Sequence, residues 1–207
     1  VDACLREWNC GERLSAVTGL LSVGLGFLAG RSAPESLGLA ELALGHAEAL
    51  CAAPLIWHAR LERAAALLAS GDVAAAARHA GDVRACVEDT PAAYLHLKAD
   101  TILAEIDCRN GDTTAATDRF REHIEYILTE SANWQLAMYV RTFPSILGPL
   151  AAAVGAADLP VHLLNMILPK YAEEALAAAH GVLPPGELDV LSTRLLGKPA
   201  AGRRAGD

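Results

Sequence analysis

A short glycine turn recurs along this chain at almost constant spacing. Arginine follows Gly30 and aspartate follows Gly71 and Gly111, so successive turns lie 41 and 40 residues apart; a fourth, less regular turn is expected at Gly155. A helix often ends at a left-handed glycine, and an aspartate directly after it can cap the next helix. The pattern therefore predicts helical hairpins that repeat about every forty residues.

The residues around the second and third turns match one another forty positions apart. Small residues at matching places let the two helices of a hairpin approach closely. No segment alternates apolar and polar residues as a half-buried strand does, and only 5% of the residues are aromatic. We therefore expect an all-α fold, a right-handed superhelix of helical hairpins. Matched pairs are Leu55 and Leu95, Ala59 and Ala99, Ala64 and Ala104, Ala75 and Ala115, and Ala76 and Ala116.

Helix ends are predicted where glycine, proline and capping residues fall. The helical-repeat domain is expected to span residues 1–182, and residues 183–207 to hold a short helix and a flexible tail. Pro144 and Pro149 fall inside one predicted helix and Pro169 inside the next, and each should kink or break its helix. The predicted helices cover residues 12–29, 35–52, 55–70, 73–88, 91–109, 113–129, 132–153, 159–178 and 185–196.

The charge pattern argues against a nucleic-acid surface. The net charge is −8 and the basic residues are scattered singly along the chain. Duplex binding depends on clustered lysine and arginine, so no direct nucleic-acid binding is expected. One basic cluster, Lys198, Arg203 and Arg204, lies in the tail, where a solvated linker is preferred over a phosphate-contacting arm.

Residues that could carry metal or catalytic chemistry are dispersed. The five cysteines form no CxxC pair, which favours reduced, buried thiols in a cytoplasmic protein. The seven histidines include no HExxH motif, and the serines no GxSxG elbow. Residues 107–112 lack the ligand pattern of a calcium loop. The sequence therefore predicts a non-enzymatic protein without catalytic, cofactor-binding or metal-binding residues.

An uncharged apolar segment lies near the start of the chain, at residues 16–30. It is shorter than the roughly 20 residues that cross a bilayer, and three glycines interrupt it. We expect a buried first helix here, in preference to a membrane span or a signal segment.

Four stretches of the sequence resemble parts of a known family. ARLERAAALLASGDVAAAARHA at 59–80 and TILAEIDCRNGDTTAATDRF at 101–120 are similar to the tetratricopeptide-like (TPR-like) repeats of large bacterial ATP-dependent transcriptional regulators, the MalT-like group of the LuxR family. Residues 139–168 resemble the segment that closes that repeat region. LPPGELDVLSTRLLG at 183–197 resembles the start of a LuxR-type helix-turn-helix or the join to another output domain, although a linker composition follows it.

This resemblance implies a TPR-like solenoid that serves as the sensor or transmission module of a cytoplasmic regulator. Neither an ATPase motif nor a recognition helix is present in the sequence. In such regulators the repeat region is implied to bind an inducer or inhibitory partner, to communicate with neighbouring domains and to help control self-association.

Contact residues are expected on the first helix of each hairpin, which tends to line the concave face of a solenoid. A protein or a small-molecule effector would bind there. The cations Arg60, Lys98 and Arg141 could pair with an acidic segment or with a phosphorylated or carboxylated effector. Packing between repeats is the competing interpretation of the aromatic members. The predicted partner-binding residues are Trp57, His58, Arg60, Tyr94, Lys98, Asp100, Trp134, Tyr139 and Arg141.

Two other function classes stay open. One is a scaffold or oligomerisation domain whose repeats contact only their neighbours. The other is a small helical enzyme that uses histidine and glutamate from adjacent helices. Two titratable groups within hydrogen-bond reach in a pocket would favour the enzyme, and a continuous groove would favour the binding module.

Overall fold

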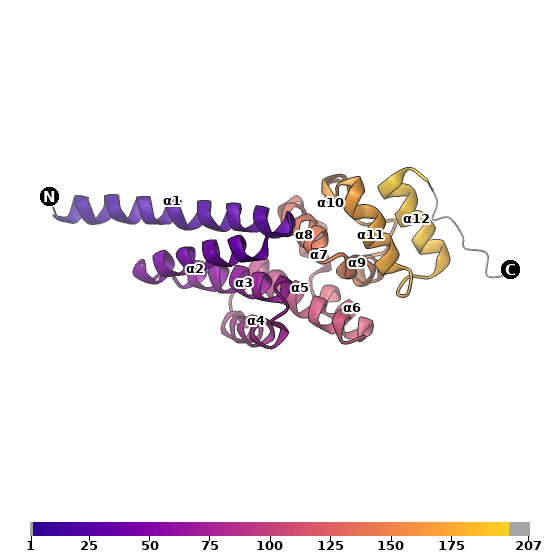
Figure 1. Cartoon of the computed structure of the whole chain (residues 1–207), viewed down its shortest axis with the longest axis horizontal. Helices are drawn as coiled ribbons and strands as arrows, with labels where there is room; N and C mark the ends of the chain where they lie inside the picture. The colour runs from indigo at the N-terminus through magenta and orange to yellow at the C-terminus, as the bar shows by residue number, and fades with distance from the viewer. Residues whose placement is uncertain (1, 199–207) are drawn as a thin grey trace. The chain divides into compact units, whose positions relative to one another are not determined.

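The computed structural model describes residues 2–198, apart from the side chains of residues 2–10, 130 and 131. All regular structure in this part is helical, which confirms the predicted all-α class (Figure 1). The predicted flexible tail lies outside the described residues from position 199 onward. Close backbone contacts divide the chain into two compact units, residues 1–106 and 107–207.

The first unit contains long helices that pack on their neighbours in sequence. α1 (Asp2–Ala29) lies against α2 (Ala33–Ala49), α2 against α3 (Ala53–Ala69), and α3 against α4 (Val73–Val87); α5 (Ala93–Arg109) begins in this unit. Buried alanines form much of the interface between α2 and α3. Their small side chains let the helix backbones approach closely. One core cluster joins Val17 and Leu21 of α1 to Ala43, Ala47 and Ala59.

The turns at Gly71 and Gly111 are equivalent, as predicted. Both glycines have positive φ, 94° and 83°, a conformation that costs little without a Cβ. The following aspartates both cap a helix: Asp72 accepts from the Ala75 N–H at 3.0 Å, and Asp112 from the Ala115 N–H at 2.9 Å. The forty-residue repeat is therefore a repeat of local structure at these two turns.

The turn between α1 and α2 differs by one residue from the prediction. The left-handed position is Arg31, with φ of 67°, and Gly30 instead continues the last turn of α1 by donating to the Gly26 carbonyl. A Cβ at Gly30 would lie 3.3 Å from the Phe27 carbonyl oxygen, so glycine relieves crowding there. Counted from the left-handed residue, the turns therefore fall at positions 31, 71 and 111.

The first helix is longer and more exposed than predicted. It begins at Asp2, and its stretch Gly11–Ala29 is the one segment among the described residues that is long and apolar enough to cross a membrane, by length and composition alone. Only 33% of that stretch is buried, and Leu14, Val23 and Phe27 are exposed. The expectation of a buried first helix therefore holds for only one side of α1.

The second unit is built from shorter helices. The predicted helix 132–153 breaks at Pro144, and the predicted helix 159–178 breaks before Pro169, as expected, whereas Pro149 lies in the first turn of α9 and does not end it. The break after Arg121, inside the predicted helix 113–129, has neither proline nor glycine to mark it. The helical segments are α6 (Thr113–Arg121), α7 (Ile124–Ile127), α8 (Glu130–Thr142), η1 (Pro144–Ile146), α9 (Leu147–Val154), α10 (Val161–Met166), α11 (Pro169–Ala179) and α12 (Pro185–Leu196).

The last helix holds the loop that follows α9. Gly155 turns the chain with φ of 95°, as predicted, and Pro160 is the N-cap of the next helix, α10. The Arg194 guanidinium on α12 donates to the Ala156 carbonyl at 2.6 Å and to the Leu159 carbonyl at 2.6 Å. The short helix predicted at the end of the chain is thus anchored to the second unit.

The cysteines differ from their predicted environment. Cys51 lies in the left-handed turn after α2, with φ of 51°, and is exposed, as is Cys86 near the end of α4. Cys108 is half-buried. The expectation of buried thiols is therefore wrong for Cys51 and Cys86, and Cys4 and Cys10 lie among the side chains that the structure does not describe.

Candidate functional site

A buried ion pair links α3 to α5 in the first unit. The side chains of Glu62 and Lys98 are 3% and 0% exposed, and the Lys98 ammonium donates to Glu62 Oε1. His58, one turn before Glu62, places its Nε2 3.7 Å from the same oxygen. The His58 ring also meets the Tyr94 ring edge-on, with 5.9 Å between centroids. We call His58, Glu62 and Lys98 the buried cluster.

Burial and charge act in opposite directions on the buried cluster. Burial favours a raised pKa for Glu62, but the Lys98 ammonium and the interaction with His58 outweigh it, so that the pKa is lowered overall. Burial lowers the pKa of Lys98 against the attraction of Glu62. Burial, together with the Lys98 charge, lowers the pKa of His58. At neutral pH the cluster therefore contains a carboxylate and a neutral imidazole.

The buried cluster is suited to joining helices. A substrate would have to displace packed side chains before it could reach the carboxylate or the ammonium. Removing one partner of such a pair leaves the other charge buried and uncompensated, which is costly. The geometry therefore assigns the cluster to the stability of the first unit.

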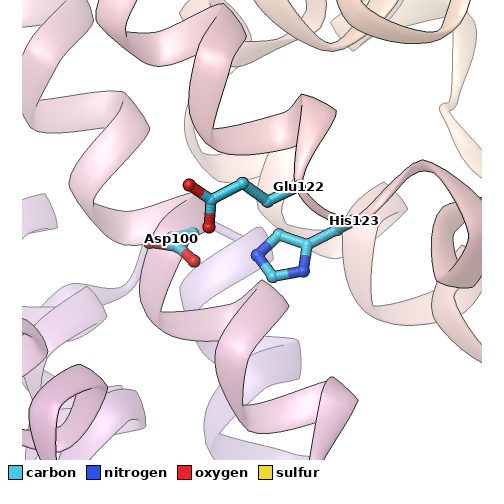
Figure 2. A group of neighbouring side chains, drawn as sticks. All are labelled: Asp100, Glu122 and His123. Atoms are coloured by element: carbon cyan, nitrogen blue, oxygen red, sulfur yellow. The ribbon is translucent and has the colours of Figure 1, made fainter. Parts of the chain in front are cut away.

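Asp100 also has a partner inside the first unit. The Arg84 Nε donates to Asp100 Oδ2 at 3.0 Å, and the Asp100 side chain is buried. Figure 2 shows Asp100 on α5, which belongs to the first unit, and Glu122 and His123 just after α6, which belong to the second. Within its own unit, Asp100 is a structural carboxylate that binds α5 to α4.

In the second unit, two cations converge on one tyrosine. The Cζ atom of Arg141 on α8 lies 5.0 Å from the centroid of the Tyr171 ring on α11, and the Lys170 Nζ lies 4.6 Å from it. Hydrogen bonds to the phenol oxygen, first from Lys170 and then from Arg141, lower the pKa of Tyr171. We call Arg141, Lys170 and Tyr171 the cationic site.

The cations of this site lack acidic partners. Among the residues that the structure describes, neither Arg141 nor Lys170 forms an ion pair, whereas Arg119 in the same unit pairs with Asp107 at 2.6 Å. The Arg141 Nε is buried without a hydrogen-bond acceptor, and its Nη1 lies 3.3 Å from the Met138 sulfur. The cationic site therefore has unused donors and an excess of positive charge.

The predicted partner-binding residues fall into different environments. Lys98, Asp100 and Tyr139 are buried. We correct the expectation that a partner can reach them: two are charged groups paired within the fold, and Tyr139 stacks on Phe143 with 6.2 Å between ring centroids. The structure brings His58, Tyr94 and Lys98 together around Glu62. Arg60 and Trp134 are exposed, and Trp57, His58, Tyr94 and Arg141 are half-buried.

Three residues of these sites were not predicted. Glu62 lies seven positions after Leu55 and four before Ala66, on the apolar stripe of α3, so helical phase could have placed it in the core. Lys170 and Tyr171 lie 29 and 30 positions after Arg141. Nothing local in the sequence indicates that contact, because it depends on how α11 packs on α8.

Comparisons with known proteins give no match. No protein-family model matches this sequence, and no curated protein or solved structure matches it.

Proposed function

We propose that this chain is a non-enzymatic helical sensor module of a bacterial transcriptional regulator. It binds an effector or partner and transmits that state to neighbouring domains of its parent protein in the cytoplasm. The observation that carries the proposal is the half-buried Arg141 without an acidic partner, on the same helix as the exposed Trp134. These two predicted contact residues remain available to a ligand.

The repeated turns support the same proposal. Equivalent capped turns connect α3 to α4 at Gly71 and α5 to α6 at Gly111. Repeated turns of this kind are typical of solenoids built from helical hairpins. A TPR-like right-handed superhelix is part of this proposal. The burial of Glu62 and Lys98 favours a binding module over an enzyme, because this pair of titratable groups is closed to a substrate and serves packing.

A reporter assay in the intact parent regulator tests the proposal. Trp134→Ala and Arg141→Met should each reduce the inducible part of reporter expression while leaving protein abundance unchanged. Leu128→Ala is the matched control, because Leu128 is an apolar residue of the same unit and is exposed to a similar degree, 50% against 48% for Trp134.

Two results would reject the proposal. One is an unchanged reporter response in both variants. The other is a parent protein whose gene encodes neither a nucleotide-binding nor a DNA-binding domain. Self-association without any effector response would favour the scaffold alternative instead.

A further inference from the structure

We propose that the cationic site binds the phosphate group of a small phosphorylated ligand, whose apolar or aromatic body lies along Met138 and Trp134. The inference rests on the proposed sensor function in one respect, since this ligand would be the effector. It specifies the chemical class of the ligand and the residues that recognise each part of it.

Electrostatics favour an anion at the cationic site. The guanidinium of Arg141 and the ammonium of Lys170 lie against one ring, 5.0 and 4.6 Å from its centroid, so their like charges repel each other. No carboxylate pairs with either cation among the described residues. An anion placed between the two cations removes this repulsion and gains charge-assisted hydrogen bonds.

The cationic site offers enough hydrogen-bond donors for a phosphate group. Arg141 offers a planar fork that includes the buried Nε without an acceptor, and Lys170 offers an ammonium with three donors. The phenol of Tyr171 can donate its proton to a ligand oxygen. The three groups equal in number the three terminal oxygens of a phosphate monoester, whereas a carboxylate has only two oxygens to accept from them.

The position of Lys170 adds to the attraction. It lies in the first turn of α11, a helix of 11 residues, where the helix dipole also favours negative charge. Lys170 is exposed, whereas the Tyr171 side chain beside it is buried. The ammonium of Lys170 is therefore open to a phosphate that approaches from solvent.

The body of the ligand is inferred from the face of α8. Trp134, Met138 and Arg141 are spaced four and three residues apart, so they share one side of the helix. About 10 Å of helix axis separates Trp134 from Arg141, which suits a small organic phosphate. The Met138 sulfur already contacts Arg141, and the exposed Trp134 offers a ring on which an apolar or aromatic group can stack.

Titration calorimetry on the whole chain at constant ionic strength tests the inference. The probes are phenyl phosphate, inorganic phosphate and benzoate. We expect phenyl phosphate to bind most tightly, inorganic phosphate more weakly and benzoate weakest. Arg141→Met and Lys170→Met should each lower the affinity for both phosphates about tenfold, because each removes a charge-assisted contact. Trp134→Ala should weaken phenyl phosphate binding and leave inorganic phosphate binding unchanged.

Controls separate binding from folding. Arg60→Met removes an exposed cation of the first unit and should leave all affinities unchanged. Tyr171→Phe keeps the packed ring and removes only the hydroxyl, so it should weaken phosphate binding without changing the helical circular dichroism signal. Absence of phenyl phosphate binding at millimolar concentration, or equal binding by the parent chain and Arg141→Met, overturns the inference. If the reporter response still depends on Trp134 and Arg141 in that case, the sensor function stands and the ligand is not a phosphate.

Discussion

Lys98 in the first unit and Lys170 in the second are both helical lysines beside another titratable side chain, yet their surroundings differ. Lys98 is buried and donates to the carboxylate of Glu62, whereas Lys170 is exposed and shares a tyrosine with a second cation. The comparison shows that a helical lysine in this chain can be buried in an ion pair or exposed beside a second cation. Burial and the sign of the neighbouring charge decide between these roles.

The largest expected effect is on the stability of the first unit. Lys98→Met should lower the free energy of unfolding by about 3–5 kcal/mol, because it leaves the Glu62 carboxylate buried without its cation. Lys170→Met should change that free energy by no more than about 0.5 kcal/mol, as substitutions at exposed positions usually do. Urea unfolding of the two variants measures both values. Equal losses would show that the two lysines have the same role.

The second expected effect is a loss of stability in acid that depends on His58. The pKa of His58 is lowered from 6.5 in the folded chain, so the unfolded chain takes up this proton first as the pH falls. The stability contributed by the neutral imidazole is complete above pH 6.5 and decreases below it. The pKa of Glu62 is lowered from 4.5, so a further decrease follows below that pH.

Thermal melting between pH 7.5 and 4 measures this dependence. His58→Gln should reduce the loss of thermal stability between pH 6.5 and 4.5. Part of that loss should remain, because the pKa of His79 is also lowered, mainly by burial. His180→Gln changes an exposed histidine of the second unit and is the matched control. A pH dependence that is the same in the parent chain and in His58→Gln would contradict the assignment.

The smallest expected effect is a gain in the free energy of unfolding. Lys170→Glu places a carboxylate beside Arg141, so it should replace repulsion with an ion pair and raise the free energy of unfolding by up to about 1 kcal/mol. The same change at Lys98 should unfold the first unit, because it buries two carboxylates together. Lys170→Glu should also abolish phosphate binding. A loss of stability in Lys170→Glu would mean that the two cations do not repel each other.

The sequence predicts those helix ends and turns that depend on residues adjacent in the chain. The turns at Gly71 and Gly111 were predictable because the glycine and its capping aspartate are adjacent, and the break at Pro144 because proline removes a helix donor. At the first turn, Gly30 and Arg31 compete for the left-handed position. The left-handed residue is Arg31, and Gly30 occupies a crowded position in the last turn of α1 that the sequence does not reveal.

The candidate sites were less predictable, because their contacts are long-range. Lys98 and Glu62 are 36 residues apart, and their pairing depends on the register in which α5 packs against α3. Arg141 was predicted as a contact residue from its position on a first helix, but its neighbours Lys170 and Tyr171 come from another helix. From its residue type, Lys98 was predicted to be an exposed contact residue. In the structure it is buried and paired with Glu62.

Two double-mutant cycles followed by urea unfolding test the difference between the units most directly. One cycle combines Glu62→Leu with Lys98→Met, and the other combines Arg141→Met with Lys170→Met. We predict a favourable coupling of about 1–3 kcal/mol between Glu62 and Lys98, and zero or unfavourable coupling between Arg141 and Lys170 in the absence of phosphate. Favourable coupling in the second cycle, or none in the first, would contradict the assignment of one pair to the fold and the other to recognition.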